Sequence, residues 1–200
     1  MKTFKATIIT FLTLLIMQSF TTMAAKTEEQ KYTIIHSEKE FEIRFYPSAI
    51  LATIYSDARS YRELAYPGFR KLAGYIFGSN ESDTKISMTS PVHMEFGKEE
   101  SSMSFVMPSS FSVDNLPRPD DQAVKIEKTK DIHAAVISFG GYASDSKISD
   151  YSKKLKALLD EKGIVYYGNF RYLGYNPPFQ LFGRRNEIIV PVRWSEQSTK

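Results

Sequence analysis

Alternation of apolar and polar residues predicts two strands in the first part of the chain, followed by a helix. Residues 41–45 alternate, and an apolar run over residues 49–55 follows after a break at Pro47. A period of two is typical of a half-buried strand, and a short apolar run is typical of a more deeply buried one. Apolar residues spaced by three and four positions then predict a helix over about residues 61–77.

The same order of elements recurs later in the chain. Residues 124–127 alternate, residues 133–139 form an apolar run, and helical spacing predicts a second helix over about residues 147–162. The apolar face of this helix consists of Ile148, Tyr151, Leu155, Leu158 and Leu159. Gly163 follows at the position where glycine commonly ends a helix. Strand, strand and helix therefore occur twice.

Each half also contains a seven-residue motif with an opening proline, a phenylalanine at the sixth position and a closing glycine. The copies are PVHMEFG at residues 91–97 and PPFQLFG at residues 177–183. Each motif is followed by a last apolar strand, over residues 103–107 and 187–192. We therefore predict a pseudo-twofold duplicated unit, because self-similarity at this scale indicates a repeated architecture. The two halves cover about residues 32–108 and 123–192.

Neither half is large enough to bury both its helix and a face of its sheet. The two halves should therefore close into one antiparallel, barrel-like sheet that carries two helices, which is an α+β architecture. Residues 108–122 between the halves are rich in Pro, Asp and Ser, and this composition predicts a surface loop.

The first 25 residues have the pattern of a secretory signal peptide. Positive charge comes first, an almost unbroken apolar run covers residues 8–17, and small residues stand at positions 24–25. The apolar run is short for a bilayer span. We expect cleavage near Ala25 or Lys26, a mature domain over residues 26–200, and export to a periplasm or to the outside of the cell. An uncleaved membrane anchor is the alternative.

The charge balance argues against nucleic acid as a partner. The chain has 26 Lys and Arg against 23 Asp and Glu, and removal of Lys2 and Lys5 with the leader lowers the basic count to 24. The absence of Cys excludes disulfides, a lipid-modified cysteine and a Cys-x-x-Cys-His haem attachment. We expect a monomer held together by its core, without stable membrane insertion once the leader is removed.

Four short motifs occur in order along the chain: KISMTSPV at residues 85–92, FGGY at 139–142, GYNPP at 174–178 and RRNE at 184–187. With these motifs the chain resembles the SOUL haem-binding family over roughly Tyr32 to Val192. The resemblance implies a distorted antiparallel barrel of eight or nine strands with two helices, related to the small-molecule-binding domains of some transcription regulators. It also implies reversible, non-covalent binding of haem or another tetrapyrrole as a ligand.

The stretch GYNPPFQLFGRRNE at residues 174–187 favours a turn. Pro177 and Pro178 have no N–H, so they fit a strand entrance or a sheet edge but not the middle of a sheet. Arg184, Arg185 and Asn186 should form the turn of the closing hairpin, after which Glu187 leads into the core. We favour this structural role over direct ligand contact, because turn residues at fixed spacing need no ligand to explain them.

The first predicted helix has more apolar surface than packing on a sheet requires. Its expected core face consists of Tyr61, Ala65, Phe69, Leu72 and Ile76, and Tyr66, Ala73 and Phe77 widen it. We predict a tetrapyrrole-binding surface of Arg62, Tyr66, Phe69, Arg70, Ala73 and Phe77, where apolar groups cover the macrocycle and guanidinium groups pair with its propionates. Alternatively, the extra apolar residues contact the 108–122 loop. Pro67 either kinks the helix or marks its start, which would rotate these faces.

Iron ligation has little support in the sequence. Some members of the family have a histidine where this chain has Phe45, and a phenyl ring cannot bind iron. His36, His93 and His133 each lie alone in a predicted strand, without a partner at metal-binding spacing. Met88 could act as a thioether ligand, but methionine more often fills a core. We predict no metal site.

Sequence motifs of common enzymes are missing, among them Gly-x-Ser-x-Gly, His-Glu-x-x-His and a phosphate-binding glycine loop. We therefore predict a binding protein without catalytic residues, which transports, buffers or scavenges its ligand. One alternative is a general interaction module for small molecules or proteins on the same scaffold. A weaker one is a hydrolase dependent on Glu187, if burial in a central cleft raises the pKa of that carboxyl.

Overall fold

The computed structural model describes residues 27–195, and the expected leader lies outside this range. The first half contains β1 (Glu28–Glu29), β2 (Thr33–Ser37), β3 (Glu42–Tyr46), β4 (Ile50–Ser56), α2 (Tyr61–Ile76), β5 (Thr89–Ser90), β6 (Val92–Phe96) and β7 (Ser101–Val106). The second half contains β8 (Lys125–Lys128), β9 (Ile132–Gly140), α3 (Asp145–Glu161), β10 (Arg171–Gly174) and β11 (Arg185–Pro191). None of the described helices is both long enough and apolar enough to cross a bilayer.

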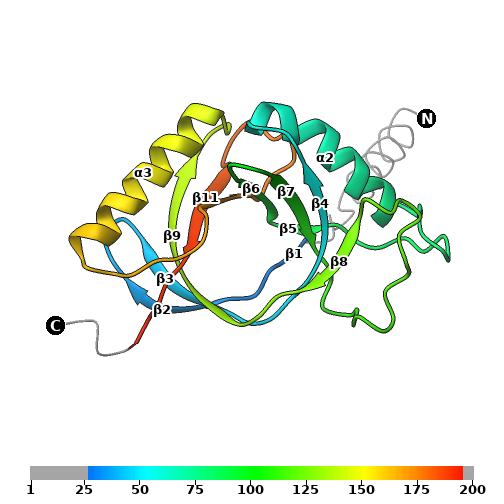
Figure 1. The fold of residues 1–200 in the computed structure, drawn as a ribbon, viewed down its shortest axis with the longest axis horizontal. Helices are drawn as coiled ribbons and strands as arrows, with labels where there is room; N and C mark the ends of the chain where they lie inside the picture. Colours follow the sequence, from blue (N-terminus) through cyan, green and yellow to red (C-terminus); the bar gives the residue numbers. More distant parts are fainter. Residues whose placement is uncertain (1–26, 196–200) are drawn as a thin grey trace, which may run out of the picture.

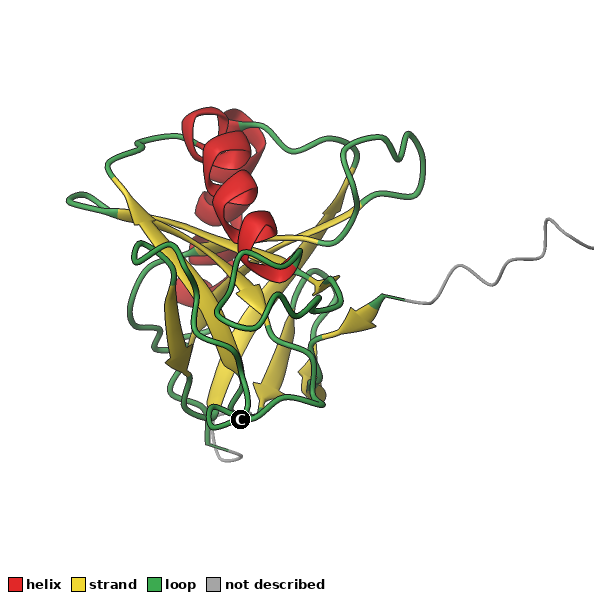
Figure 2. Ribbon diagram, turned by 90° about the vertical axis from the view of Figure 1, so that its right-hand side faces the viewer, coloured by secondary structure: helices red, strands yellow, loops and turns green. Residues whose placement is uncertain are grey.

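Nine strands form one curved antiparallel sheet in the order β2-β3-β9-β11-β10-β6-β7-β4-β8. The sheet wraps most of the way round a ring, and both helices pack on the outside of the ring (Figure 1). The edge strands β2 and β8 do not pair with each other, so the barrel is incomplete. Figure 2 shows the helices gathered on one side of the sheet. The expected α+β fold, a distorted barrel of eight or nine strands with two helices, is confirmed.

The strand order has twofold character. Four strands of the first half have a counterpart in the second half: β3 corresponds to β8, β4 to β9, β6 to β10 and β7 to β11. When each strand is replaced by its counterpart, the order β3-β9-β11-β10-β6-β7-β4-β8 becomes the same order read from the other end. β2 has no counterpart and makes the ninth strand. The halves meet at three places, where β3 pairs with β9, β10 with β6, and β4 with β8.

The two copies of the proline–glycine motif do not occupy equivalent places. Residues 91–97 contain strand β6, whereas residues 177–183 lie in the loop between β10 and β11. The strand that corresponds to β6 is β10, which ends before the second motif begins. The structural equivalence that we predicted from the motif is therefore wrong. The same residue types at the same spacing do not determine whether a segment pairs into a sheet.

Helix α2 begins at a side-chain cap. The hydroxyl of Ser60 accepts a hydrogen bond from the backbone N–H of Glu63 at 3.2 Å, and the Glu63 carboxylate accepts one from the N–H of Arg59 at 2.8 Å. These bonds satisfy donors that a helix start leaves free. The helix continues through the exposed Pro67, so this proline marks neither its start nor its end.

The core face of α2 differs from the expected one. The buried residues of the helix are Leu64, Gly68, Leu72, Ala73, Tyr75 and Ile76. Phe69 was expected in the core but is 40% exposed, and its ring contacts Phe105 edge-on at 5.2 Å between centroids. A Cβ at Gly68 would lie 3.1 Å from Cε of Met103, so the helix approaches the sheet closely at this glycine. The observed face is therefore rotated relative to the predicted one.

The apolar face predicted for the second helix is buried as expected. In α3, Ile148, Leu155 and Leu159 are buried, while Tyr151 and Leu158 are half-buried against the core. Tyr151 stacks on Phe139 of β9 with ring centroids 4.4 Å apart. These contacts fix α3 on the same side of the sheet as α2.

The two faces of the sheet have different chemistry. Residues that point toward the helices are apolar, such as Ile43, Ile54, Met103, Ile137 and Ile188. The alternate residues point to the opposite side, called the inner face here, and many of them are polar although they are buried: Arg44, Thr53, His93, Ser104 and Glu187. Strand periodicity produces this difference, because successive side chains point to opposite faces. The inner face is where polar chemistry is concentrated.

Candidate functional site

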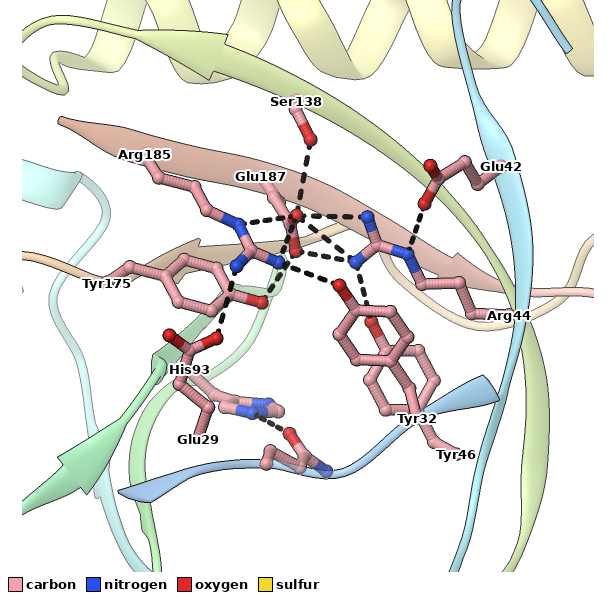
Figure 3. Close-up of polar contacts among 11 residues, drawn as sticks. Glu29, Tyr32, Glu42, Arg44, Tyr46, His93, Ser138, Tyr175, Arg185 and Glu187 are labelled. Atoms are coloured by element: carbon pink, nitrogen blue, oxygen red, sulfur yellow. Dashed lines mark hydrogen bonds and ion pairs between the residues drawn. The ribbon is translucent and has the colours of Figure 1, made fainter. Parts of the chain in front are cut away.

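Glu187 is the centre of a buried ion-pair cluster on the inner face. Its carboxylate accepts three hydrogen bonds from the guanidinium group of Arg44, at 3.0–3.1 Å, and the two side chains are 0% and 4% exposed. Arg44 lies 143 positions earlier, on β3. Figure 3 shows the cluster on the side of the sheet away from α3.

A second guanidinium group and two hydroxyl groups complete the contacts of Glu187. Arg185 donates from Nε and Nη2 to the carboxylate at 3.0 and 2.9 Å, and Arg185 also lies over the ring of Tyr175, 3.9 Å from its centroid. Tyr175 and Ser138 donate to Glu187 at 2.7 and 3.2 Å. The carboxylate is therefore saturated with donors from β3, β9, β11 and the loop after β10.

Tyrosines and further carboxylates surround the two arginines (Figure 3). The hydroxyl of Tyr46 accepts a hydrogen bond from Arg44 at 3.2 Å, and the guanidinium of Arg44 lies over the ring of Tyr32 at 4.2 Å. Glu42 accepts from Arg44 at 2.6 Å, and Glu29 accepts from Arg185 at 3.1 Å. The N-terminal segment that carries Glu29 and Tyr32 thus closes one side of the cluster.

Charge decides the ionisation state of this cluster. Burial acts to raise the pKa of Glu187, but the charges and hydrogen bonds of Arg44, Tyr175 and Arg185 outweigh it and hold the pKa below its ordinary value. Burial raises the pKa of Tyr46 to about 12, and burial together with the charge of Glu187 raises that of Tyr175. Glu187 is therefore ionised at neutral pH, and both phenols are protonated.

The net pKa shift of Glu187 is opposite to the one expected for a catalytic carboxyl, because its charged partners outweigh burial. A general base works best when its pKa lies near the operating pH and when it can reach a substrate proton. Glu187 has the opposite properties, because its pKa is lowered and its carboxylate is fully buried and paired with two arginines. Its contacts are those of a structural ion pair that holds β3 to β11 across β9.

The hairpin loop before β11 is organised by side-chain contacts. Arg184 donates to the backbone carbonyls of Pro177 and Gln180 at 2.7 and 2.8 Å, and Asn176 Oδ1 accepts from the N–H of Arg185 at 2.6 Å. Arg185 and Asn186 already belong to β11, so the predicted turn over residues 184–186 ends at Arg184, two residues earlier than expected.

The same loop exposes three large apolar side chains that the sequence analysis did not single out. Phe179, Leu181 and Phe182 are 80%, 65% and 85% exposed. The charge of Arg184 interacts with the hydroxyl of Tyr61, the first residue of α2, so this loop lies near the start of α2. Exposed apolar groups in such a cluster are a typical feature of binding surfaces.

The six residues predicted to contact a tetrapyrrole lie on one side of α2. They are Arg62, Tyr66, Phe69, Arg70, Ala73 and, directly after the helix, Phe77. Tyr66 and Phe77 are 72% and 64% exposed, both arginines are exposed, and Ala73 is buried. We call this set the α2 surface. Exposed aromatic rings beside two guanidinium groups can cover a planar ring and pair with its carboxylates.

The three histidines lie in three different strands, β2, β6 and β9, as predicted. Phe45 and His133 face each other across β3 and β9 with ring centroids 5.3 Å apart, and His36 stacks on Trp194 at 5.4 Å. His93 lies alone on the inner face. Among residues 27–195, no group of three His, Cys, Asp or Glu side chains is arranged to hold a metal ion.

Two cavities among the described residues border the N-terminal segment. The larger has a volume of about 440 Å³ and is lined by the N-terminal segment, the β3–β4 turn and the loop after β7, including Lys31, Ile50, Met107, Phe111 and Lys128. The smaller, of about 120 Å³, is lined by residues that include His93, Tyr46 and Arg171. Gln30 and Pro47 border both cavities, so the N-terminal segment lies between them.

Comparison with known proteins gives a consistent picture. A family model described as "SOUL heme-binding protein" matches residues 27–191. "Heme-binding protein 2" of Mus musculus is 34% identical over 156 residues, which cover 74% of this chain and 76% of that protein. "Heme-binding protein 1" of Mus musculus is 32% identical over 125 residues, or 59% of this chain and 66% of that protein.

Solved structures with the same fold are much more distant in sequence. The EcmrR C-terminal domain superposes with a TM-score of 0.59 at 11% identity and covers 82% of this chain and 99% of its own. A protein described as a hydrolase from Listeria innocua superposes with a TM-score of 0.54 at 9% identity, covering 80% and 94%. At this level of identity the likeness shows the fold alone.

Proposed function

The chain belongs to the SOUL heme-binding protein family, and on this basis we propose that it binds haem or another tetrapyrrole reversibly and without a covalent bond. The match to the family over residues 27–191 is the observation that carries the proposal. Relatives named for haem binding, at up to 34% identity, support the same ligand.

The α2 surface is the contact region that we propose for the macrocycle. Tyr66 and Phe77 expose most of their rings to solvent, and the chain itself does not cover them. Arg62 and Arg70 are exposed on the same side of the helix and can pair with two propionates. Phe182 at the tip of the hairpin loop, which passes near the start of α2, offers a further apolar contact.

The proposed role is that of a carrier without chemistry of its own. We propose that the protein is exported after cleavage of its leader and that it transports, buffers or scavenges the tetrapyrrole as a monomer. A surface of exposed aromatic and arginine side chains suits reversible capture, because it needs no covalent bond and no metal ligand from the protein.

A haemin titration tests the proposal. We expect a saturable shift of the Soret band in the micromolar range. Arg70→Ala should weaken binding about tenfold or more, since a charge-assisted hydrogen bond contributes about 1.5–3 kcal/mol. Arg193→Ala is the matched control, because Arg193 is also exposed but follows β11, away from α2. A protein that gives no saturable shift would exclude haem, and equal affinity of Arg70→Ala and Arg193→Ala would exclude the α2 surface.

The larger cavity favours a second function, a binding module for other small molecules. Its volume of about 440 Å³ lies within the usual range for ligand pockets, and it shares no lining residue with the α2 surface. A thermal-shift screen separates the two functions, because a ligand at 100 times its Kd should add about 2.7 kcal/mol of stability. A hit whose effect survives Arg70→Ala would support the cavity as its site.

A further inference from the structure

The smaller cavity on the inner face is lined by polar side chains that the ion-pair cluster does not use, among them Thr129 and the exposed Lys130 at its border. It lies between β6, β10 and the N-terminal segment, and His93, Arg171 and Gln30 contribute polar atoms to it. Leu51 and Ile189 supply apolar wall. In the sheet register, Leu173 of β10 lies opposite His93, and Arg171 lies opposite Glu95, so both polar side chains project from neighbouring strands into one space.

His93 has one ring nitrogen without a partner. The residue is 6% exposed, and its Nε2 lies 2.8 Å from Oε1 of Gln30. Nδ1 is buried and has no hydrogen-bond partner among residues 27–195. Most buried polar atoms in proteins are paired, so an orphaned ring nitrogen beside a cavity indicates that a partner is supplied by something else.

Arg171 is also short of partners. Its ion pair with Glu95 is long, because the carboxylate oxygen lies 4.0 Å from Nε, beyond hydrogen-bonding distance, and the Arg171 side chain is 20% exposed. The other oxygen of Glu95 accepts a hydrogen bond from Asn169 at 2.8 Å. By contrast, Arg44 and Arg185 make several hydrogen bonds of 2.6–3.2 Å each. Burial lowers the pKa of Arg171, while the charge of Glu95 acts to raise it.

A carboxylate group would satisfy both side chains. We propose that the smaller cavity is a carboxylate-binding site in which the guanidinium group of Arg171 and Nδ1 of His93 donate to the two oxygens. Guanidinium and carboxylate are complementary in charge and in geometry. The site is separate from Glu187, whose own donors are already engaged.

Neutral histidine can act as the second donor. Burial lowers the pKa of His93 to about 3, with a further contribution from the charge of Arg171, so the ring is neutral at physiological pH. A neutral ring carries one proton, and a turn of the Gln30 amide by 180° lets its NH₂ donate to Nε2 and leaves the proton on Nδ1. With its amide in this turned orientation, Gln30 favours the tautomer that can donate to the ligand.

The volume limits the ligand. A cavity of about 120 Å³ equals the space of about four water molecules in the liquid, which is the size of acetate with its four heavy atoms. The carboxylate could belong to a free small acid or to the propionate of a tetrapyrrole that reaches in from the larger cavity, since Gln30 and Pro47 border both spaces. The chemistry at Arg171 is the same in both cases.

The test uses the full chain labelled with ¹⁵N-histidine, which has three imidazole groups to follow. Acetate is titrated without any tetrapyrrole present, so the result does not depend on the proposed function. We expect a saturable change of the His93 nitrogen shifts, with a proton on Nδ1 in the bound state. Acetamide, which has the same size but no charge, should bind at least about tenfold more weakly.

Variants of Arg171 decide whether the site is the one described. Arg171→Gln should weaken acetate binding about 10–100-fold. Arg171→Lys keeps the charge but not the two parallel N–H donors of the guanidinium group, so its affinity for acetate should lie between those of the wild type and Arg171→Gln. Arg118→Gln is the control, because Arg118 is exposed and lies outside the cavity. If the amide spectrum shows that Arg171→Gln does not fold, two measurements still test the proposal. They are the acetate affinity of Arg171→Lys and the preference of the wild-type protein for acetate over acetamide.

A porphyrin identifies the source of the carboxylate. Mesoporphyrin that displaces acetate, while its dimethyl ester does not, would assign the site to a propionate. Independent binding of both would assign it to a free acid. The proposal is overturned if neither acetate nor mesoporphyrin changes the His93 signals, or if Arg171→Gln binds acetate as tightly as Arg118→Gln does.

Discussion

Replacement of Glu187 by glutamine should destabilise the protein strongly. Arg44 is 4% exposed and makes three of its hydrogen bonds to the Glu187 carboxylate, so the change replaces a buried carboxylate with a neutral amide and leaves Glu42 as the anionic partner of Arg44. Breaking a buried ion pair by removal of one partner costs about 3–5 kcal/mol. Arg185 should lose less, because it is 34% exposed and keeps its contact with Glu29.

Urea denaturation followed by circular dichroism measures this cost. We expect Glu187→Gln to lower the midpoint without a change in the m value, which would locate the effect in the folded state. Glu40→Gln provides the control, since it breaks an ion pair with Lys154 in which both side chains are more than 40% exposed. Such surface pairs contribute little, so the control midpoint should hardly move.

The pH dependence gives an independent check. The pKa of Glu187 lies below its unfolded value of 4.5, so its contribution to stability is present above pH 4.5 and is lost as the pH falls through the folded pKa. The difference between wild type and Glu187→Gln should therefore be largest at neutral pH and shrink in acid. A destabilisation below about 1 kcal/mol, or a difference that stays constant from pH 7 to pH 3, would refute the account of the cluster.

Three further predictions concern stability. The pKa of Tyr46 is raised from 10 to about 12, so stability should fall as the pH rises above 10, and Tyr46→Phe should reduce this fall in urea titrations at alkaline pH. Ser60→Ala removes the cap of α2 and should cost about 1 kcal/mol, measured as a lower urea midpoint, whereas an unchanged midpoint would show that the cap is dispensable. Leu155→Ala in α3, at a position with 0% exposure, should cost about 2–5 kcal/mol by the same measurement, and a smaller loss would mean that the core closes around the gap.

Much of the fold could be predicted from the sequence because its signals are local. Alternation at residues 41–45 and helical spacing at 147–162 follow from which side of each element is buried, and both segments form the expected elements. The face of α2 was harder to predict. Gly68 packs closest to the sheet, and a glycine adds no apolar signal to a periodic pattern. Its position in the core depends on contact with Met103, which lies far along the chain.

The polar part of the inner face could not be predicted in the same way. Arg44 alternates with apolar neighbours, and this pattern usually places a charged side chain in solvent. It is buried because β3 and β11 both pair with β9, which brings Arg44 beside Glu187 although 143 positions separate them. Likewise, the unpaired Nδ1 of His93 and the long ion pair of Arg171 appear only when every neighbour is placed. The unbroken apolar run after Glu187 was the available hint, since such a run indicates burial on both faces.

The interleaved strand order has a consequence for assembly. Strands of one half pair with strands of the other half at three places: β3 pairs with β9, β10 with β6, and β4 with β8. A nascent chain cannot complete its sheet until β11 has left the ribosome. Two fragments produced by a cut in the loop between β7 and β8 should therefore each form an incomplete sheet, and they should complement each other when mixed. The protein is therefore a candidate for a split reporter, whose signal depends on the association of the two fragments.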